Sequence, residues 1–180
     1  MELMKNETLR TIHTRRTCRA YSPVQISDTE LQTILEAGTW APTGMGMQSP
    51  MMIAVQNKAD RDELARLNAA VMGDDGDPFY GAPTVVVVLA DTTCGTCVED
   101  GSLVLGTLLL AAESIGVSGG WIHRAKEVMA SPEGQALLRK WGVAEPEKYV
   151  GVGNCILGYA AEGGKGEPAP RKDGYTLVVE

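Results

Sequence analysis

The sequence predicts a protein of the α+β class that folds as one domain over residues 1–180. Apolar spacing typical of helices and short valine-rich runs typical of strands both occur. They do not alternate strictly and no segment repeats, which favours an α+β layer over a doubly wound sheet. Hydrophobic residues make up 44% of the 180 residues, so the chain can bury one core but is too short for two independent domains.

Amphipathic spacing predicts helices in several parts of the chain. Leu9 and Ile12 lie three residues apart, as one face of a short first helix requires. Ser27 and Glu30 have capping-box spacing and begin the second helix, which ends near Gly38. The predicted helices cover residues 6–14, 27–38, 60–71 and 101–112, and a last one begins at Ser131-Pro132-Glu133.

Short apolar runs predict strands, and glycine-rich or polar stretches predict the connections between them. The valine-rich run over 83–90 is the clearest buried strand. The other predicted strands cover residues 51–55 and 149–160. Predicted loops and turns cover residues 41–50, 73–77 and 116–122, and an irregular tail over 161–174 leads to a final apolar run, 175–179.

The helix predicted over residues 101–112 contains no charged residue, and its leucines cover every side. A helix that is apolar all round must be buried on all sides. One subunit of 180 residues can hardly achieve this, so we expect part of the helix to pack against a second chain. Asp100 precedes the helix, and we expect its carboxylate to cap free N–H groups at the positive end of the helix dipole.

The composition excludes several classes of function. A formal charge of -7 would repel polyanions, which argues against nucleic-acid binding. No apolar stretch reaches the roughly 18 residues needed to span a bilayer, and residues 1–6 lack the apolar segment of a secretory signal. We therefore expect a cytoplasmic protein with reduced cysteines, and the scattered cysteines and two histidines argue against a metal site.

Cationic residues gather in two short segments of this acidic chain. Arg15, Arg16 and Arg19 lie near the amino terminus, and Arg171 and Lys172 lie near the carboxyl terminus. The planar guanidinium suits phosphate oxygens, so one interpretation is a bound phosphate. The alternative is a solvated basic face without a ligand.

Other motifs point less clearly to chemistry. Cys94 and Cys97 have the spacing of a redox dithiol, but they lie outside a thioredoxin-like context, so dithiol catalysis is the less favoured interpretation. Glycines 151, 153 and 158 lack the spacing of a dinucleotide fingerprint. The glycine-rich stretch before Trp121 can bring backbone N–H groups close to a flat ligand, or it can be an ordinary tight turn.

Four motifs, taken in order, resemble the nitroreductase family. Residues 15–21, Arg-Arg-Thr-Cys-Arg-Ala-Tyr, look like its amino-terminal Arg-Arg-Ser-x-Arg-x-Phe signature. Residues 41–48 are similar to its Ala-Pro-Ser-x-x-Asn-x-Gln loop. Residues 100–122 resemble its central helix and flavin-facing turn, and Pro170-Arg171-Lys172 resembles its basic motif near the carboxyl terminus.

The resemblance implies a nitroreductase-like central mixed sheet flanked by helices, in a homodimer with FMN at the interface. It places the FMN phosphate near Arg15, Arg16 and Arg171, and Arg19 at the pyrimidine edge, where a cation stabilises the reduced flavin. The loop over 42–46 would come from the other subunit. The cofactor-binding residues that the resemblance implies are Arg15, Arg16, Thr17, Arg19, Pro42, Thr43, Gly44, Gly46, Gly119, Gly120, Trp121 and Arg171.

The implied activity is the reduction of a small oxidant by NAD(P)H in a ping-pong mechanism, with a nitroaromatic, a quinone or an activated alkene as the oxidant. The flavin carries this chemistry, so no catalytic side chain is implied. Gly46 stands where the family commonly has Asn, which removes one side-chain contact to the cofactor. Two alternatives stay open: a flavin-binding protein of the same fold with non-reductase chemistry, and a dithiol redox protein that uses Cys94 and Cys97.

Overall fold

The computed structural model describes residues 3–180, and its centre is a four-stranded sheet in the order β1-β2-β4-β3. Each neighbouring pair of strands is antiparallel. The resemblance implies a mixed sheet, whereas the four-stranded sheet is antiparallel; an isolated parallel bridge joins Thr17 to Gly119 of β3 outside the named strand pairs. The strands are β1 (Pro50–Val55), β2 (Thr84–Asp91), β3 (Ser118–Ile122) and β4 (Tyr149–Gly158).

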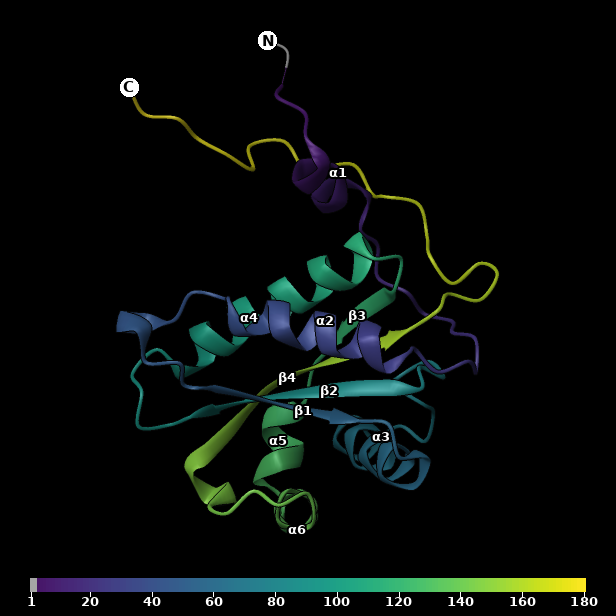
Figure 1. Ribbon diagram of the computed structural model, residues 1–180, viewed down its shortest axis with the longest axis vertical. Coiled ribbons are helices and arrows are strands. Elements are labelled where there is room, and N and C mark those ends of the chain that lie inside the picture. Colours follow the sequence, from purple (N-terminus) through teal and green to yellow (C-terminus); the bar gives the residue numbers. More distant parts are fainter. Residues whose placement is uncertain (1–2) are drawn as a thin grey trace.

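Helices cover both faces of the sheet, which confirms the predicted α+β class. In Figure 1, α2 and α4 lie over one face, while α3, α5 and α6 lie over the other. The α-helices are α1 (Glu7–Thr14), α2 (Asp28–Thr39), α3 (Lys58–Met72), α4 (Cys97–Ser114), α5 (Ala125–Ala130) and α6 (Pro132–Lys140). Two short 3₁₀ helices, η1 (Gly44–Gly46) and η2 (Pro146–Lys148), complete the described elements.

Strand β2 forms the middle of the core because its side chains alternate between the two helical layers. Val85 and Val87 pack in the cluster that includes α3, α5 and α6, whereas Val86 and Val88 pack in the cluster that includes α2 and α4. All four valines are fully buried. Burial of each side chain contributes about 1.5–3 kcal/mol, so this strand anchors both layers.

The amino-terminal caps that the sequence predicts for α2 and α6 are confirmed. Ser27 Oγ accepts from the backbone N–H of Glu30 at 3.2 Å, and the Glu30 carboxylate accepts from the backbone N–H of Ser27 at 2.8 Å. Ser131 caps α6 by accepting from the backbone N–H of Gly134 at 3.0 Å. These contacts are local in sequence, which is why the motif alone predicts them.

The first predicted helix is present; in it Ile12 is 46% exposed and Thr11 is buried, because α1 lies outside the sheet layers and contacts α4. One prediction about local structure is wrong. The glycine-rich stretch before Trp121 is strand β3 and not a turn. A Cβ at Gly119 would lie 3.0 Å from Leu109 of α4, so its missing side chain allows the strand and helix to pack closely.

Helix α4 departs from the prediction in where it begins and in the role of Asp100. It begins at Cys97, and in one chain it is buried on one side only: Val104, Leu105 and Leu108 are buried, but Leu103 is 48% exposed. The Asp100 carboxylate does not cap this helix, because it points to the loop over residues 43–49. No helix within residues 3–180 is long and apolar enough to cross a membrane.

Candidate functional site

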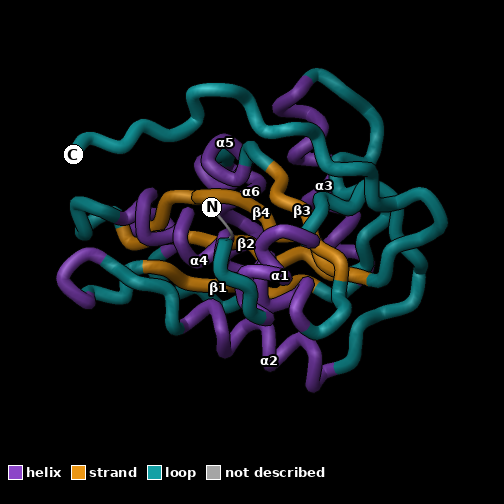
Figure 2. The backbone as a smooth tube through the Cα atoms, turned by 90° about the horizontal axis from the view of Figure 1, so that it is seen from above, coloured by secondary structure: helices purple, strands orange, loops and turns teal. Residues whose placement is uncertain are grey.

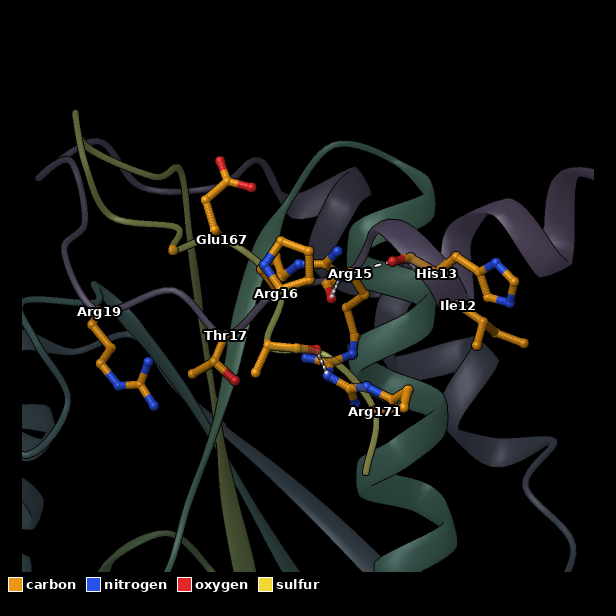
Figure 3. Close-up of a pocket in the computed structure, with 11 residues that line it drawn as sticks. Ile12, His13, Arg15, Arg16, Thr17, Arg19, Glu167 and Arg171 are labelled. Atoms are coloured by element: carbon orange, nitrogen blue, oxygen red, sulfur yellow. Dashed lines mark hydrogen bonds between the residues drawn. The ribbon is translucent and has the colours of Figure 1, made fainter. Parts of the chain in front are cut away.

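The arginine pocket is a cavity of about 690 Å³ formed by residues 12–19 and residues 166–171 (Figure 3). These segments come from opposite ends of the sequence. Thr17 lies between Arg19 on one side and Arg15 and Arg171 on the other. The structure therefore brings together the five predicted residues Arg15, Arg16, Thr17, Arg19 and Arg171.

Backbone pairing holds the two segments in place. The N–H of Cys18 donates to Gly119 O at 3.1 Å, and the N–H of Arg19 donates to Gly164 O at 2.8 Å. Lys165 adds an ion pair to Glu113 of α4 at 2.8 Å. Beyond these contacts, residues 166–171 line the pocket, and Figure 2 shows the carboxyl-terminal segment running as a loop around the outside, away from the sheet.

The pocket is rich in hydrogen-bond donors. Arg16 donates to the carbonyls of His13 and Arg15 at 2.8 and 2.7 Å, and Arg171 donates to the Ala169 carbonyl. Within residues 3–180, neither Arg15 nor Arg19 forms an ion pair with a carboxylate. Guanidinium groups that share a cavity repel one another, so the cavity favours an anion.

Cys155 lies on β4 and is a buried thiol. Burial raises the pKa of Cys155 to about 12, although the positive charge of Arg15 acts in the opposite direction. The side chain is fully buried in the cluster between the sheet, α2 and α4. It therefore contributes packing to that cluster and does not line the pocket.

A second group of predicted residues lies on the loop around η1. The N–H of Gly44 donates to Asp100 Oδ1 at 2.9 Å, and the Ser49 hydroxyl donates to Asp100 Oδ2 at 2.9 Å. The backbone hydrogen bond from Gly44 lowers the pKa of Asp100 below its usual range, although burial opposes the shift. This carboxylate fixes the loop to α4, while Met45 at the tip is 97% exposed.

The third group lies on β3, directly beside the arginine pocket. A Cβ at Gly120 would lie 3.3 Å from the Thr17 methyl group, so strand and pocket are in contact. Trp121 is half-exposed, with its ring centroid 5.5 Å from that of His123. Its indole lies over Gly153, where a Cβ would approach Nε1 to 2.6 Å.

Comparison with known proteins identifies the family. The family model described as "Nitroreductase family" matches residues 12–76. A relative from Archaeoglobus fulgidus, named as a candidate NADH dehydrogenase/NAD(P)H nitroreductase, is 31% identical over 176 residues, which cover 94% of this chain and 90% of that protein. The chain belongs to the nitroreductase family. A Vibrio harveyi relative named NADPH-flavin oxidoreductase is 26% identical, covering 79% of this chain and 67% of its own length.

Solved structures of nitroreductases share the fold. The structure of a nitroreductase with bound FMN from Bacteroides fragilis is 33% identical and has a TM-score of 0.89, covering 98% of this chain and 100% of its own. A second nitroreductase with bound FMN, from Desulfitobacterium hafniense, is 32% identical with a TM-score of 0.84 and the same coverage. The nitroreductase-like arrangement expected from the sequence motifs is thus confirmed.

In this family member, the predicted site residues fall into two places. The arginine pocket and the residues Gly119, Gly120 and Trp121 adjoin one another, whereas the loop with Pro42, Thr43, Gly44 and Gly46 does not line the pocket. The sequence does not predict that residues 166–169 line the pocket. Glu167 is the single charged residue in this stretch, so no cluster of charge marks it as a site. Nor does the sequence predict the role of Ser49, whose contact with Asp100 spans 51 residues.

Proposed function

We propose that this chain is an FMN-dependent oxidoreductase that uses NAD(P)H to reduce a small oxidant, such as a nitroaromatic compound, a quinone or an activated alkene. The observation that carries the proposal is the arginine pocket beside β3. A chain with a net charge of -7 gathers four guanidinium groups around one cavity, and none of the four forms an ion pair with a carboxylate among the residues described. That arrangement suits a ligand with a phosphate at one end.

The residues present fit FMN. Arg15, Arg16 and Arg171 supply donors for one terminal phosphate, and the Thr17 hydroxyl supplies a donor for phosphate or ribityl oxygens. Arg19 lies on the opposite side of Thr17 from Arg15 and Arg171. An FMN molecule whose phosphate binds Arg15 and Arg171 would therefore extend its pyrimidine edge toward Arg19. The cavity volume, about 690 Å³, is in the range of cofactor sites.

Bound FMN would supply the redox chemistry, because its ring accepts a hydride from the nicotinamide and then passes electrons to the oxidant. The side chains position and polarise it. Arg19 would stabilise negative charge at the pyrimidine edge, and the backbone of Gly119 and Gly120 would come close to the ring because no side chain intervenes. We propose that donor and oxidant use the same exposed face in turn, which gives ping-pong kinetics.

We further propose that the active form is a homodimer in which the loop over 42–46 completes the partner's site. Support comes from apolar side chains that one chain leaves exposed: Trp40 is 79% exposed, Met45 97% and Leu103 48%. A ligand that contacts both chains stabilises only the assembled state. Sedimentation at several protein concentrations should therefore show a tighter dimer with FMN than without it, and a folded monomer that binds FMN with full affinity would contradict the proposal.

The first experiment is to release and identify the cofactor of the purified protein. We expect FMN and not FAD, because the pocket offers cations for one phosphate group. The flavin absorbance should then bleach when NADH or NADPH is mixed with the loaded protein in a stopped-flow instrument. A protein that contains FAD, or takes up no flavin on reconstitution, would overturn the assignment, and FMN that neither nucleotide reduces would favour non-reductase chemistry.

A matched pair of variants tests the pocket itself. Arg15→Ala removes a charge-assisted phosphate contact and should weaken FMN binding by about 1.5–3 kcal/mol, or about 10- to 150-fold. Arg10→Ala removes the same charge from the neighbouring helix α1, but Arg10 pairs with Glu7 and does not line the pocket. FMN titration by fluorescence should show almost no change for Arg10→Ala, and equal effects of the two variants would contradict the assigned contact.

A further inference from the structure

Two cysteines lie close together in the loop between β2 and α4. The N–H of Cys97 donates to Cys94 O at 3.2 Å and closes a four-residue turn. The ends of such a turn lie within about 7 Å, which overlaps the Cα separation of about 4.4–6.8 Å that a disulfide spans. Both thiols are free and partly exposed, whereas Cys18 and Cys155 are fully buried.

Cys94 also opens onto a cavity of its own. This second cavity, of about 360 Å³, is lined by residues 47–51, at the entry to β1, and by Asp91, Thr93, Cys94 and Tyr149. It shares no lining residue with the arginine pocket. A small molecule can therefore reach the Cys94 sulfur without entering the proposed flavin site.

We propose that Cys94 and Cys97 form a reversible disulfide by exchange with small-molecule disulfides of the glutathione type. The Cys94 thiolate attacks one sulfur of the disulfide RSSR, and a mixed disulfide forms as the first RS⁻ leaves. The Cys97 thiolate then attacks the Cys94 sulfur, and the second RS⁻ leaves. Overall, two protein thiols are oxidised to one disulfide, and RSSR is reduced to two RSH that take up the two protons.

The contacts of the turn link this reaction to the loop around η1. Cys94 Sγ lies 3.7 Å from Asp100 Oδ2 and 3.4 Å from Thr96 Oγ1. The Asp100 carboxylate accepts a hydrogen bond from the N–H of Gly44. Thr96 packs closely against Gly44, so that a Cβ built on Gly44 would lie 2.2 Å from Thr96 Oγ1. When Cys94 Sγ turns to bond Cys97, it leaves Asp100 and shifts Thr96. The oxidised protein should therefore hold the Gly44 loop less firmly.

This linkage rests on the proposed function, in which the Gly44 loop contacts FMN. Oxidation should then weaken FMN binding. Allosteric coupling of ordinary strength corresponds to about fivefold or more in affinity. The thiol reaction itself needs no flavin, so it can be measured separately.

The test of the disulfide uses the full chain, with and without FMN, equilibrated in buffers of reduced and oxidised glutathione. Remaining thiols are blocked with a maleimide, and the peptides are analysed by mass spectrometry. We expect a Cys94–Cys97 crosslink with the mass loss of two hydrogens, reversed by dithiothreitol. Cys97→Ser should stop at a glutathione adduct on Cys94, and Cys94→Ser should form no crosslink. Folded protein that stays fully reduced, or wild type that keeps the adduct, would overturn the proposal.

The test of the linkage compares FMN affinity in the reduced and oxidised proteins. We expect about fivefold weaker binding after oxidation of the wild type and no change in the Cys94→Ser/Cys97→Ser variant under the same treatment. Equal affinities in the two redox states would overturn the link to the Gly44 loop. Failure to bind FMN in either redox state would instead overturn the proposed function. The crosslinking result would still stand, because disulfide formation does not require FMN.

Discussion

Replacing Gly44 with alanine should disturb the attachment of the η1 loop to α4. The new methyl group would lie 2.2 Å from Thr96 Oγ1, 3.1 Å from its Cβ and 3.2 Å from its Cγ2. The first distance is about 1 Å too short for non-bonded atoms, and a threonine side chain has no flexible end that can move away. The loop must shift, and the 2.9 Å hydrogen bond from Gly44 N–H to Asp100 is strained or lost. Overpacking of this kind costs about 1–3 kcal/mol.

A double-mutant cycle with Thr96→Ala measures that contact. Removing Oγ1 and Cγ2 leaves only a 3.1 Å approach, which a small adjustment relieves, so Gly44→Ala/Thr96→Ala should recover most of the lost stability. The coupling energy should fall within about 0.5–3 kcal/mol, measured by urea unfolding of all four proteins.

Gly46→Ala is the control for backbone effects. Gly46 has a φ of 69° and no atom within 4 Å of a Cβ, so alanine there should cost about 1–2 kcal/mol that Thr96→Ala cannot restore. A Gly44→Ala protein as stable as the wild type would refute the packing argument. So would a rescue of Gly46→Ala by Thr96→Ala.

Three further substitutions test how the scaffold is held. Arg61→Met should cost about 1–3 kcal/mol in urea unfolding, because it removes the 3.0 Å hydrogen bond to the buried Ala82 carbonyl and the ion pair with the partly exposed Asp77. The control Arg66→Met breaks an exposed ion pair with Glu63 and should change stability by under about 1 kcal/mol. Burial would raise the pKa of Asp77, but hydrogen bonds from Arg61 and two backbone N–H groups outweigh it and lower the pKa. That stabilisation is present above the unfolded pKa of about 3.9 and is lost as pH falls through the folded pKa, so Asp77→Asn should flatten the loss of stability below about pH 4. Gly134→Ala places a methyl group 1.9 Å from the Val128 carbonyl oxygen and should lower the melting temperature despite alanine's better helix propensity.

The sequence predicts those parts of the fold whose signals are local. The capping box of Ser27 and Glu30, the cap at Ser131 and the valine-rich strand β2 each depend on neighbouring residues or on a continuous apolar run. Strand β3 depends on distant partners instead. Its glycines read as a turn by themselves, and they form a strand because β4 pairs along one edge and α4 packs on one face.

The candidate site divides in the same way. The arginines of the pocket can be predicted, because clustered cations stand out in an acidic chain. The roles of Asp100 and Ser49 could not be predicted, because they depend on contacts that join positions 51 and 56 residues apart. Asp100 at the amino end of a helix is a reasonable cap by sequence, yet a distant backbone N–H provides its hydrogen bond.

Helix α4 shows where a sequence pattern exceeds what one chain can satisfy. Its composition predicts burial on every side, and the structure of the single chain buries one side against the sheet and leaves Leu103 and Val98 about half-exposed. The free energy gained by covering such apolar side chains grows with the area removed from water. A helix whose apolar pattern is wider than its buried face therefore indicates a second surface. A two-fold dimer would place the same face of α4 from each chain at the interface, beside the loop that Asp100 attaches to it.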